Sequence, residues 1–155
     1  MIEYIQILTT FIGIVGGLLV GVVIERFRLK HELRIQKIKR VAPYLEILSP
    51  TMKNLAIDSK YAVELQQVNR EDSSVLQRLC EELKEFETWY NDFRQKGMEI
   101  ELESLNVILY RSLLGVFMYA RYTDKYGVHF IVQRLNSFHK MCQIARESLE
   151  SLLGG

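Results

Sequence analysis

The chain starts with one long apolar run at its N-terminus. Residues 5–24 hold no charged side chain, and Glu3 is the only charged residue before position 25. A helix rises about 1.5 Å per residue, so a run of this length spans about 30 Å, the thickness of a bilayer's hydrocarbon core. A cleaved signal peptide would carry basic residues before the run and a small-residue cleavage site, and neither is present. We therefore expect a single transmembrane helix over residues 1–24.

Beyond the apolar run, hydrophobic residues and one histidine recur at three- and four-residue steps, which is a helical period. We expect the helix to continue out of the bilayer as a stalk over residues 25–48. Pro43 should kink or interrupt this stalk, because proline lacks an amide hydrogen and crowds the preceding turn. Ser49 and Pro50 predict a new helix start, since serine favours the N-cap and proline the first helical position. The recurring residues are Ile24, Phe27, His31, Ile35, Ile38, Val41, Leu45 and Leu48.

Residues 49–155 show further helical periods and no sustained strand pattern. The pattern predicts an all-α fold in which this part of the chain forms a bundle of four or five helices. The first of these helices should end near Val68, and the others should end or bend at Gly97 and Gly127. The apolar positions of the first are Ile57, Tyr61, Leu65 and Val68, and the later apolar stripes cover residues 76–93, 102–120 and 128–152.

The charges divide the chain differently from the apolar residues. Residues 25–40 hold seven basic residues against Glu25 and Glu32, a net charge of +5, whereas residues 41–155 have a net charge of −3. The positive-inside rule then places the C-terminal side in the cytoplasm and the short N-terminus outside. We expect this basic collar to contact anionic lipid headgroups. The collar consists of Arg26, Arg28, Lys30, Arg34, Lys37, Lys39 and Arg40.

Four small residues share one face of the expected transmembrane helix. Thr9, Gly13, Gly17 and Gly21 are spaced four residues apart, which repeats the small-xxx-small pattern three times. Lipid provides no hydrophobic drive between helices, so close backbone approach across small residues becomes a main source of association. The spacing predicts self-association through this face and leaves Gly16 outside it.

Common catalytic and metal-binding patterns are absent from the sequence. There is no phosphate-binding glycine loop, no zinc spacing and no calcium loop, so we expect neither a metal nor a cofactor, and no small-molecule substrate is evident. Cys80 and Cys142 are expected to be buried structural thiols, and the acids of residues 81–103 to be solvated. The acidic body also disfavours a general nucleic-acid binder, although residues 121–146 offer a modest basic, tyrosine-bearing surface.

One short motif carries candidate chemistry. Arg134 and His139 form an R-x4-H in the last expected helix, where they flank the apolar positions Leu135 and Phe138. This motif resembles that of HEPN domains, small all-α bundles that dimerise and often cleave RNA. There the arginine holds a phosphate and the histidine takes part in proton transfer without a metal. Catalytic HEPN motifs usually have a polar residue directly after the arginine, whereas this chain has Leu135, which places ribonuclease activity in doubt.

A second R-x4-H, Arg26 and His31, lies in the basic collar, where membrane electrostatics explains it. A membrane helix, a basic collar and a late R-x4-H together resemble the small membrane-anchored accessory proteins of type VI-B CRISPR systems. The resemblance implies a homo-oligomer in the bacterial inner membrane that strengthens antiviral defence by permeabilising the membrane, as a pore, alongside an RNA-guided ribonuclease. Two alternatives stay open: a membrane-tethered HEPN ribonuclease that binds RNA, and a non-catalytic anchor or scaffold.

Overall fold

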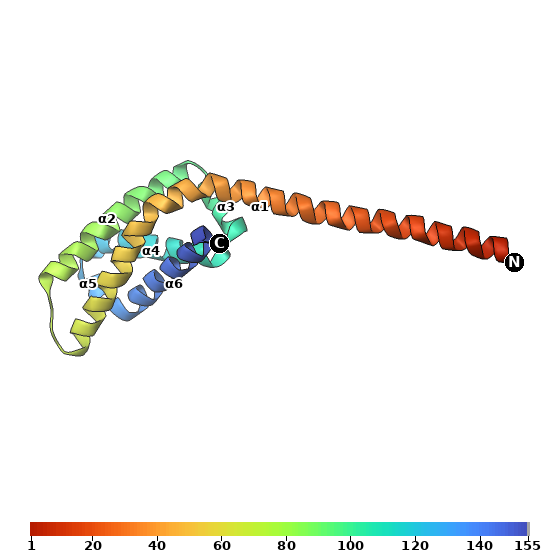
Figure 1. The fold of residues 1–155 in the computed structure, drawn as a ribbon. Coiled ribbons are helices and arrows are strands. Elements are labelled where there is room, and N and C mark those ends of the chain that lie inside the picture. The colour runs from red at the N-terminus through yellow and green to blue at the C-terminus, as the bar shows by residue number, and fades with distance from the viewer. Residues whose placement is uncertain (155) are drawn as a thin grey trace. The chain divides into compact units, whose positions relative to one another are not determined.

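Residues 1–154 of the computed structural model form six α-helices and no β-strand (Figure 1). The all-α prediction is therefore confirmed for the part of the chain that the structure describes. The helices are α1 (Ile2–Gln67), α2 (Ser73–Gln95), α3 (Met98–Leu105), α4 (Val107–Tyr126), α5 (His129–Val132) and α6 (Leu135–Gly154).

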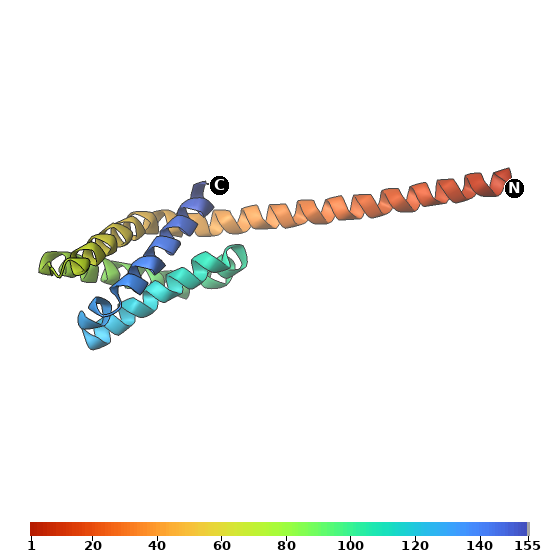
Figure 2. The same cartoon turned by 90° about the horizontal axis from the view of Figure 1, so that it is seen from below.

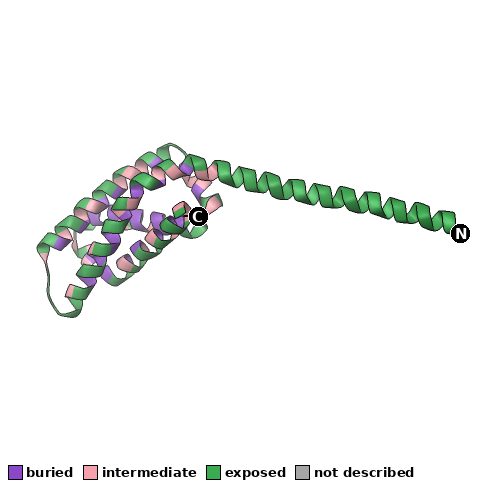
Figure 3. Ribbon diagram, in the orientation of Figure 1, coloured by how far each residue is buried: buried purple, intermediate pink, exposed green. Residues whose placement is uncertain are grey.

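The chain divides into two units, Met1–Ile38 and Lys39–Gly155. The first unit has no buried residue, and its ribbon is coloured as exposed almost throughout (Figure 3). The second unit begins ten residues before the expected domain start at 49, because Val41, Leu45 and Leu48 are already part of its core. The C-terminal half of the expected stalk therefore belongs to the bundle.

Neither proline ends α1, so the expected new start at Ser49–Pro50 is wrong, and of the kink or interruption expected at Pro43 the interruption does not occur. A proline inside a helix costs about 3 kcal/mol through the lost hydrogen bond and the crowded turn. Both proline rings lie on the exposed side of α1. Burial of Leu45 and Leu48 on the opposite side stabilises the helix through this region and offsets that cost.

Helix α4 packs against α2, α3, α5 and α6, and α6 lies beside it in Figure 2. Aromatic residues of α2 fill much of the core. Tyr90 is completely buried and its ring stacks on Phe117 of α4 with centroids 4.4 Å apart. The Tyr90 hydroxyl donates a hydrogen bond to Glu99, which also pairs with Arg94. The buried phenol thus has the hydrogen-bond partner that burial requires.

The buried side of α1 in the second unit is the predicted one at Val41, Leu45 and Leu48, but not beyond residue 50. Ile57 and Tyr61 are 49% and 45% exposed, whereas the residues turned to the core include Ala56, Ser59 and Ala62. These small residues allow a neighbouring backbone to approach closely, and the larger buried residues Met52, Leu55 and Val63 pack beside them. The apolar periodicity therefore identified the helix and misplaced its inner side beyond residue 50.

Two breaks divide helices that the sequence predicted as continuous. Asn106 separates α3 from α4; its backbone is extended, and its side chain accepts a hydrogen bond from the Leu109 amide. This is N-cap geometry, which satisfies one of the free amides at a helix start. The second break lies at residues 133–134, between α5 and α6. Gly97 and Gly127 adopt positive φ at the ends of α2 and α4, as predicted.

Candidate functional site

The small-residue face of α1 is open along its whole length. Thr9, Gly13, Gly17 and Gly21 are all exposed, and a Cβ atom added at any of the three glycines would meet no other atom within 4 Å. The Thr9 hydroxyl donates to the carbonyl of Ile5, so the hydroxyl is satisfied within the helix itself. Such a face presents backbone and short side chains only, as close helix contacts in lipid require.

The basic collar is exposed, and its members differ in their partners. Arg28 pairs with Glu25 at 3.0 Å and with Glu32 at 3.7 Å along the helix. Arg40 lies in the second unit, where its guanidinium pairs with Glu101 of α3. The seven cations therefore do not form a uniform set, because the last one is engaged by the bundle.

Arg134 lies in the turn before α6 and not inside a helix. Its carbonyl accepts the amide hydrogen of Phe138 in the first turn of α6. Its guanidinium donates to the carbonyl of Phe130 at 3.2 Å and lies 4.2 Å from the centre of that ring. The first residue of the motif is thus directed to α5.

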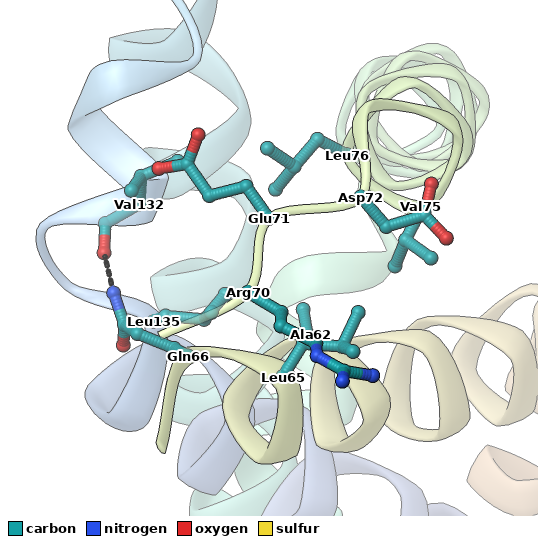
Figure 4. Close-up of a pocket in the computed structure, with 10 residues that line it drawn as sticks. All are labelled: Ala62, Leu65, Gln66, Arg70, Glu71, Asp72, Val75, Leu76, Val132 and Leu135. Carbon is teal, nitrogen blue, oxygen red and sulfur yellow. Dashed lines mark hydrogen bonds between the residues drawn. The ribbon is translucent and has the colours of Figure 1, made fainter. Parts of the chain in front are cut away.

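The position of this turn is fixed from α1. The Gln66 amide donates to the carbonyl of Val132 at 3.1 Å, and both residues border a small cavity with Leu135 (Figure 4). The cavity has a volume of about 40 Å³, enough for a water molecule but not for a substrate. It is therefore a packing feature that holds the turn.

His139 is directed to α1 instead. Its Nδ1 lies 2.9 Å from Ser59 Oγ, and that hydroxyl donates to the carbonyl of Ala56 at 3.1 Å. The contact with Ser59 engages Nδ1 in either tautomer of the ring, which leaves Nε2 outside this hydrogen bond. Burial lowers the pKa of His139 first, and the charge of Lys60 lowers it further, while Glu64 opposes them. The imidazole is therefore neutral near pH 7.

A groove of about 460 Å³ lies beside His139, between α1 and α6. Its cations are Lys60 and Arg146, and Arg146 already pairs with Glu150 at 2.9 Å. Arg134 is not among its lining residues, and no hydrogen bond joins Arg134 to His139 within residues 1–154. The two members of the motif thus have separate partners in one chain, and a neutral base faces this groove without the motif's arginine.

Glu82 of α2 departs from the expectation that the acids of residues 81–103 are solvated. It is half-buried, and its Oε2 is buried without a hydrogen-bond partner. Burial and a hydrogen bond with Asp58 of α1 raise the pKa of Glu82 to about 8, although Arg78 acts in the opposite direction. Arg78 lies 3.5 Å from Asp58. Glu82 therefore holds a proton near neutral pH at the contact between α1 and α2.

The cysteines match the expectation in part, since Cys142 is buried and Cys80 only half-buried. No group of three metal-ligating side chains exists among the described residues.

The sequence reasoning missed Ser59 and Lys60, whose relation to His139 depends on how α1 packs against α6. A polar residue between Ala56 and Ala62 on an otherwise small, apolar side of a helix was the available signal for Ser59.

Comparison with protein-family models, with curated proteins and with solved structures found no match to this chain.

Proposed function

We propose that the protein is a single-pass membrane protein that self-associates through its N-terminal helix. One observation carries this proposal: the most apolar 18-residue window of α1 has a mean hydropathy of 2.6, and none of it is buried. A helix from the core of a globular protein would be covered by its own chain. An uncovered apolar helix with all its backbone hydrogen bonds made internally matches what a bilayer requires.

The charge distribution supports an orientation with the N-terminus outside and the bundle in the cytoplasm. Side chains from Arg26 to Arg34 are exposed directly after the apolar run. In this position they can contact anionic headgroups of the inner leaflet, each worth about 1 kcal/mol near a charged surface. The resemblance to accessory proteins of type VI-B CRISPR systems supports a bacterial inner membrane.

Self-association would bring several apolar helices together at their small-residue faces. An oligomer of such helices can enclose a channel whose apolar wall opens or closes by wetting. We propose membrane permeabilisation as the activity, and antiviral defence alongside an RNA-guided ribonuclease as its setting. The openness of the Gly13 and Gly17 positions supports the assembly, and the resemblance supports the setting.

The test replaces Gly13 and Gly17 together by leucine. The added side chains would separate the helices, so the detergent-solubilised oligomer should fall to a smaller mass and dye entry into expressing cells should stop. Gly16→Leu is the matched control, because Gly16 is an equally open glycine outside the face. An unchanged mass and dye entry in the double variant would refute association through this face, as would equal losses from the control.

A second candidate, a membrane-tethered ribonuclease, is favoured by one observation: the neutral His139 lines an open groove. His139 would act as general base through Nε2, and Lys60 is the nearest cation for a phosphate. Arg134 of a second copy would complete such a site. Cleavage of labelled RNA by the full-length protein that His139→Ala abolishes would support it. No cleavage, or cleavage that His139→Ala leaves intact, would eliminate it.

A further inference from the structure

One face of the bundle gathers aromatic rings and cations, of which only Arg134 has a role above, in the ribonuclease candidate. It spans α4, α5 and the turn before α6, and we call it the cation–aromatic face. Its members are Arg121, Tyr122, Lys125, Tyr126, Phe130 and Arg134.

The cations of this face form no ion pair with a described residue, although the charge of Arg121 opposes the rise in the pKa of Glu87. Arg121, Lys125 and Arg134 have no carboxylate within ion-pair distance in residues 1–154, whereas Arg94 and Arg146 of the same bundle pair with Glu99 and Glu150. Each unpaired cation lies instead over a ring. Arg134 lies 4.2 Å from the centre of Phe130, Lys125 lies 5.2 Å from Tyr126, and Arg121 lies 5.8 Å from Phe117 of the core. Their charges are therefore available to an anionic partner.

The rings of the face lie nearly parallel and are partly open to solvent. Tyr122 and Tyr126 are 6.0 Å apart at an interplanar angle of 15°, and Tyr122 and Phe130 are 5.2 Å apart at 28°. Tyr122 is 39% exposed and Tyr126 58% exposed. Burial alone does not explain three aromatic rings in this position, since two of them remain in contact with water.

A groove adjoins the face between α2 and α4. It has a volume of about 430 Å³, within the size range of small-ligand sites. Three cations and no acid line it, together with two aromatic rings and a methionine. The lining residues are Arg94, Phe117, Met118, Arg121, Tyr122 and Lys125.

We propose that the cation–aromatic face and this groove bind a single strand of nucleic acid. Phosphates would lie against Arg121, Lys125 and Arg134, and bases would stack on Tyr122 and Tyr126. Proteins that bind single strands combine a positively charged groove with aromatic rings in this way. The net charge of −3 over residues 41–155 does not oppose it, because no acid among the described residues lines the groove and only Arg94 of its three cations is paired, with Glu99. This binding does not depend on the membrane proposal.

Lipid headgroups would supply the same negative charge without a planar group for the rings. The near-parallel arrangement of Tyr122, Tyr126 and Phe130 therefore favours a nucleic acid over a bilayer surface as the partner. A mononucleotide has the same base and phosphate as a strand, so the experiment separates these two sources.

The experiment uses the full-length protein in nanodiscs of zwitterionic phosphatidylcholine. Fluorescence anisotropy follows a labelled twelve-nucleotide oligouridylate with and without competing uridine monophosphate. Arg121→Gln with Lys125→Gln should weaken binding at least tenfold and reduce the salt dependence, since two phosphate contacts are lost. Tyr122→Leu should weaken it about tenfold through lost stacking. All three changes are at exposed positions, and circular dichroism checks the fold.

Lys53→Gln with Lys140→Gln is the matched control, because it removes two exposed cations outside the face. Unchanged binding in this control, with the losses above, supports the proposal; competition by the monophosphate at equal concentration would identify a single nucleotide as the bound unit. No binding at 100 μM protein would overturn the proposal. So would an equal loss in the control, or binding to phosphatidylserine nanodiscs that exceeds binding to RNA. His139→Ala should leave this binding unchanged, which separates it from the ribonuclease candidate.

Discussion

The two parts of α1 have the same secondary structure and opposite surroundings. In the first unit, Phe11 and Leu18 are each 65% exposed, whereas in the second unit Leu45 and Leu48 are at most 1% exposed. Both parts are helical and apolar on at least one side. The difference shows that the apolar surface of one helix can be covered in two ways. The rest of the bundle covers the second part and, we propose, lipid covers the first.

Polar positions account for the difference. The second part carries Glu46, Lys53 and Glu64 on its exposed side, so water can solvate that side while the other packs. Residues 5–24 have no charged side chain on any side. A helix that is apolar all round is buried in a large core or spans a membrane.

Trp89, the only tryptophan, lies in the bundle and donates to the carbonyl of Tyr44, so its fluorescence reports on the second unit alone.

The largest effect is expected from Leu48→Ala. Leu48 is buried, and truncation of a core leucine removes its packing and leaves a cavity, at a cost of about 2–5 kcal/mol. Urea unfolding of the full-length protein in detergent, followed by Trp89 fluorescence, should show this loss. Leu18→Ala is the control on the same helix and should leave the transition within about 0.5 kcal/mol, as exposed substitutions usually do. Equal losses from both would show that the two parts of α1 are not distinct.

A smaller effect is expected from a glycine that differs from those of the first unit. A Cβ added at Gly115 of α4 would lie 1.9 Å from the Met141 sulfur of α6, so Gly115→Val should cost about 1–3 kcal/mol by overpacking. Gly17→Val should leave the Trp89 transition unchanged, because nothing lies within 4 Å of that position. Addition of Met141→Ala should recover part of the loss at Gly115. A loss that Met141→Ala does not reduce would contradict this contact.

The smallest effect is expected from pH, which should change the stability of the second unit through Glu82. The pKa of Glu82 is raised to about 8 by burial and by Asp58, with Glu85 and Arg78 also facing it and Cys142 of α6 nearby. The folded state therefore holds a proton that the unfolded state releases above its ordinary pKa of about 4.5. Stability should fall as pH rises from about 4.5 to 8 and level off above that. The expected loss is about 1–2 kcal/mol, reduced by partial solvation.

Glu82→Gln should flatten this profile and make the protein more stable than the parent chain at pH 8. Urea midpoints measured by Trp89 fluorescence between pH 5 and 8.5 provide the test. Glu81→Gln, at an exposed neighbouring position, should retain the parent's slope. A slope that persists in Glu82→Gln would show that the proton belongs to another group, with Glu87 the first alternative because its pKa is also raised by burial and by Asp124.

Local signals predicted the ends of several helices correctly. Gly97 and Gly127 adopt the positive φ that favours glycine. The buried side of α2 includes Leu79, Leu83, Phe86, Tyr90 and Phe93, as the spacing of the apolar residues indicated. Asn106 was missed because the apolar period continues across it, although its N-cap geometry ends one helix and starts the next. Pro50 misled the prediction of a new helix start, since the cost of a proline inside a helix is local and the packing that offsets it comes from distant residues.

The R-x4-H motif was likewise predictable only in part from the sequence. The sequence alone contained the spacing of Arg134 and His139 but could not reveal that Arg134 lies in the turn before α6, or that His139 contacts Ser59, which is 80 residues away in the sequence. The unpaired cations of the cation–aromatic face were visible as residue types and not as a face. Their relation to Tyr122, Tyr126 and Phe130 exists only when α4, α5 and the following turn are packed.

The sequence by itself determined the all-α class, the apolar N-terminal helix, the basic collar and the small-residue face, because each depends on composition or on spacing within one helix. Only the tertiary structure decided which side of α1 is buried along its second half, which acid holds a proton near neutral pH and which cations stay unpaired. These features depend on contacts between helices, and the energy of such contacts is set by burial and geometry that no local pattern specifies.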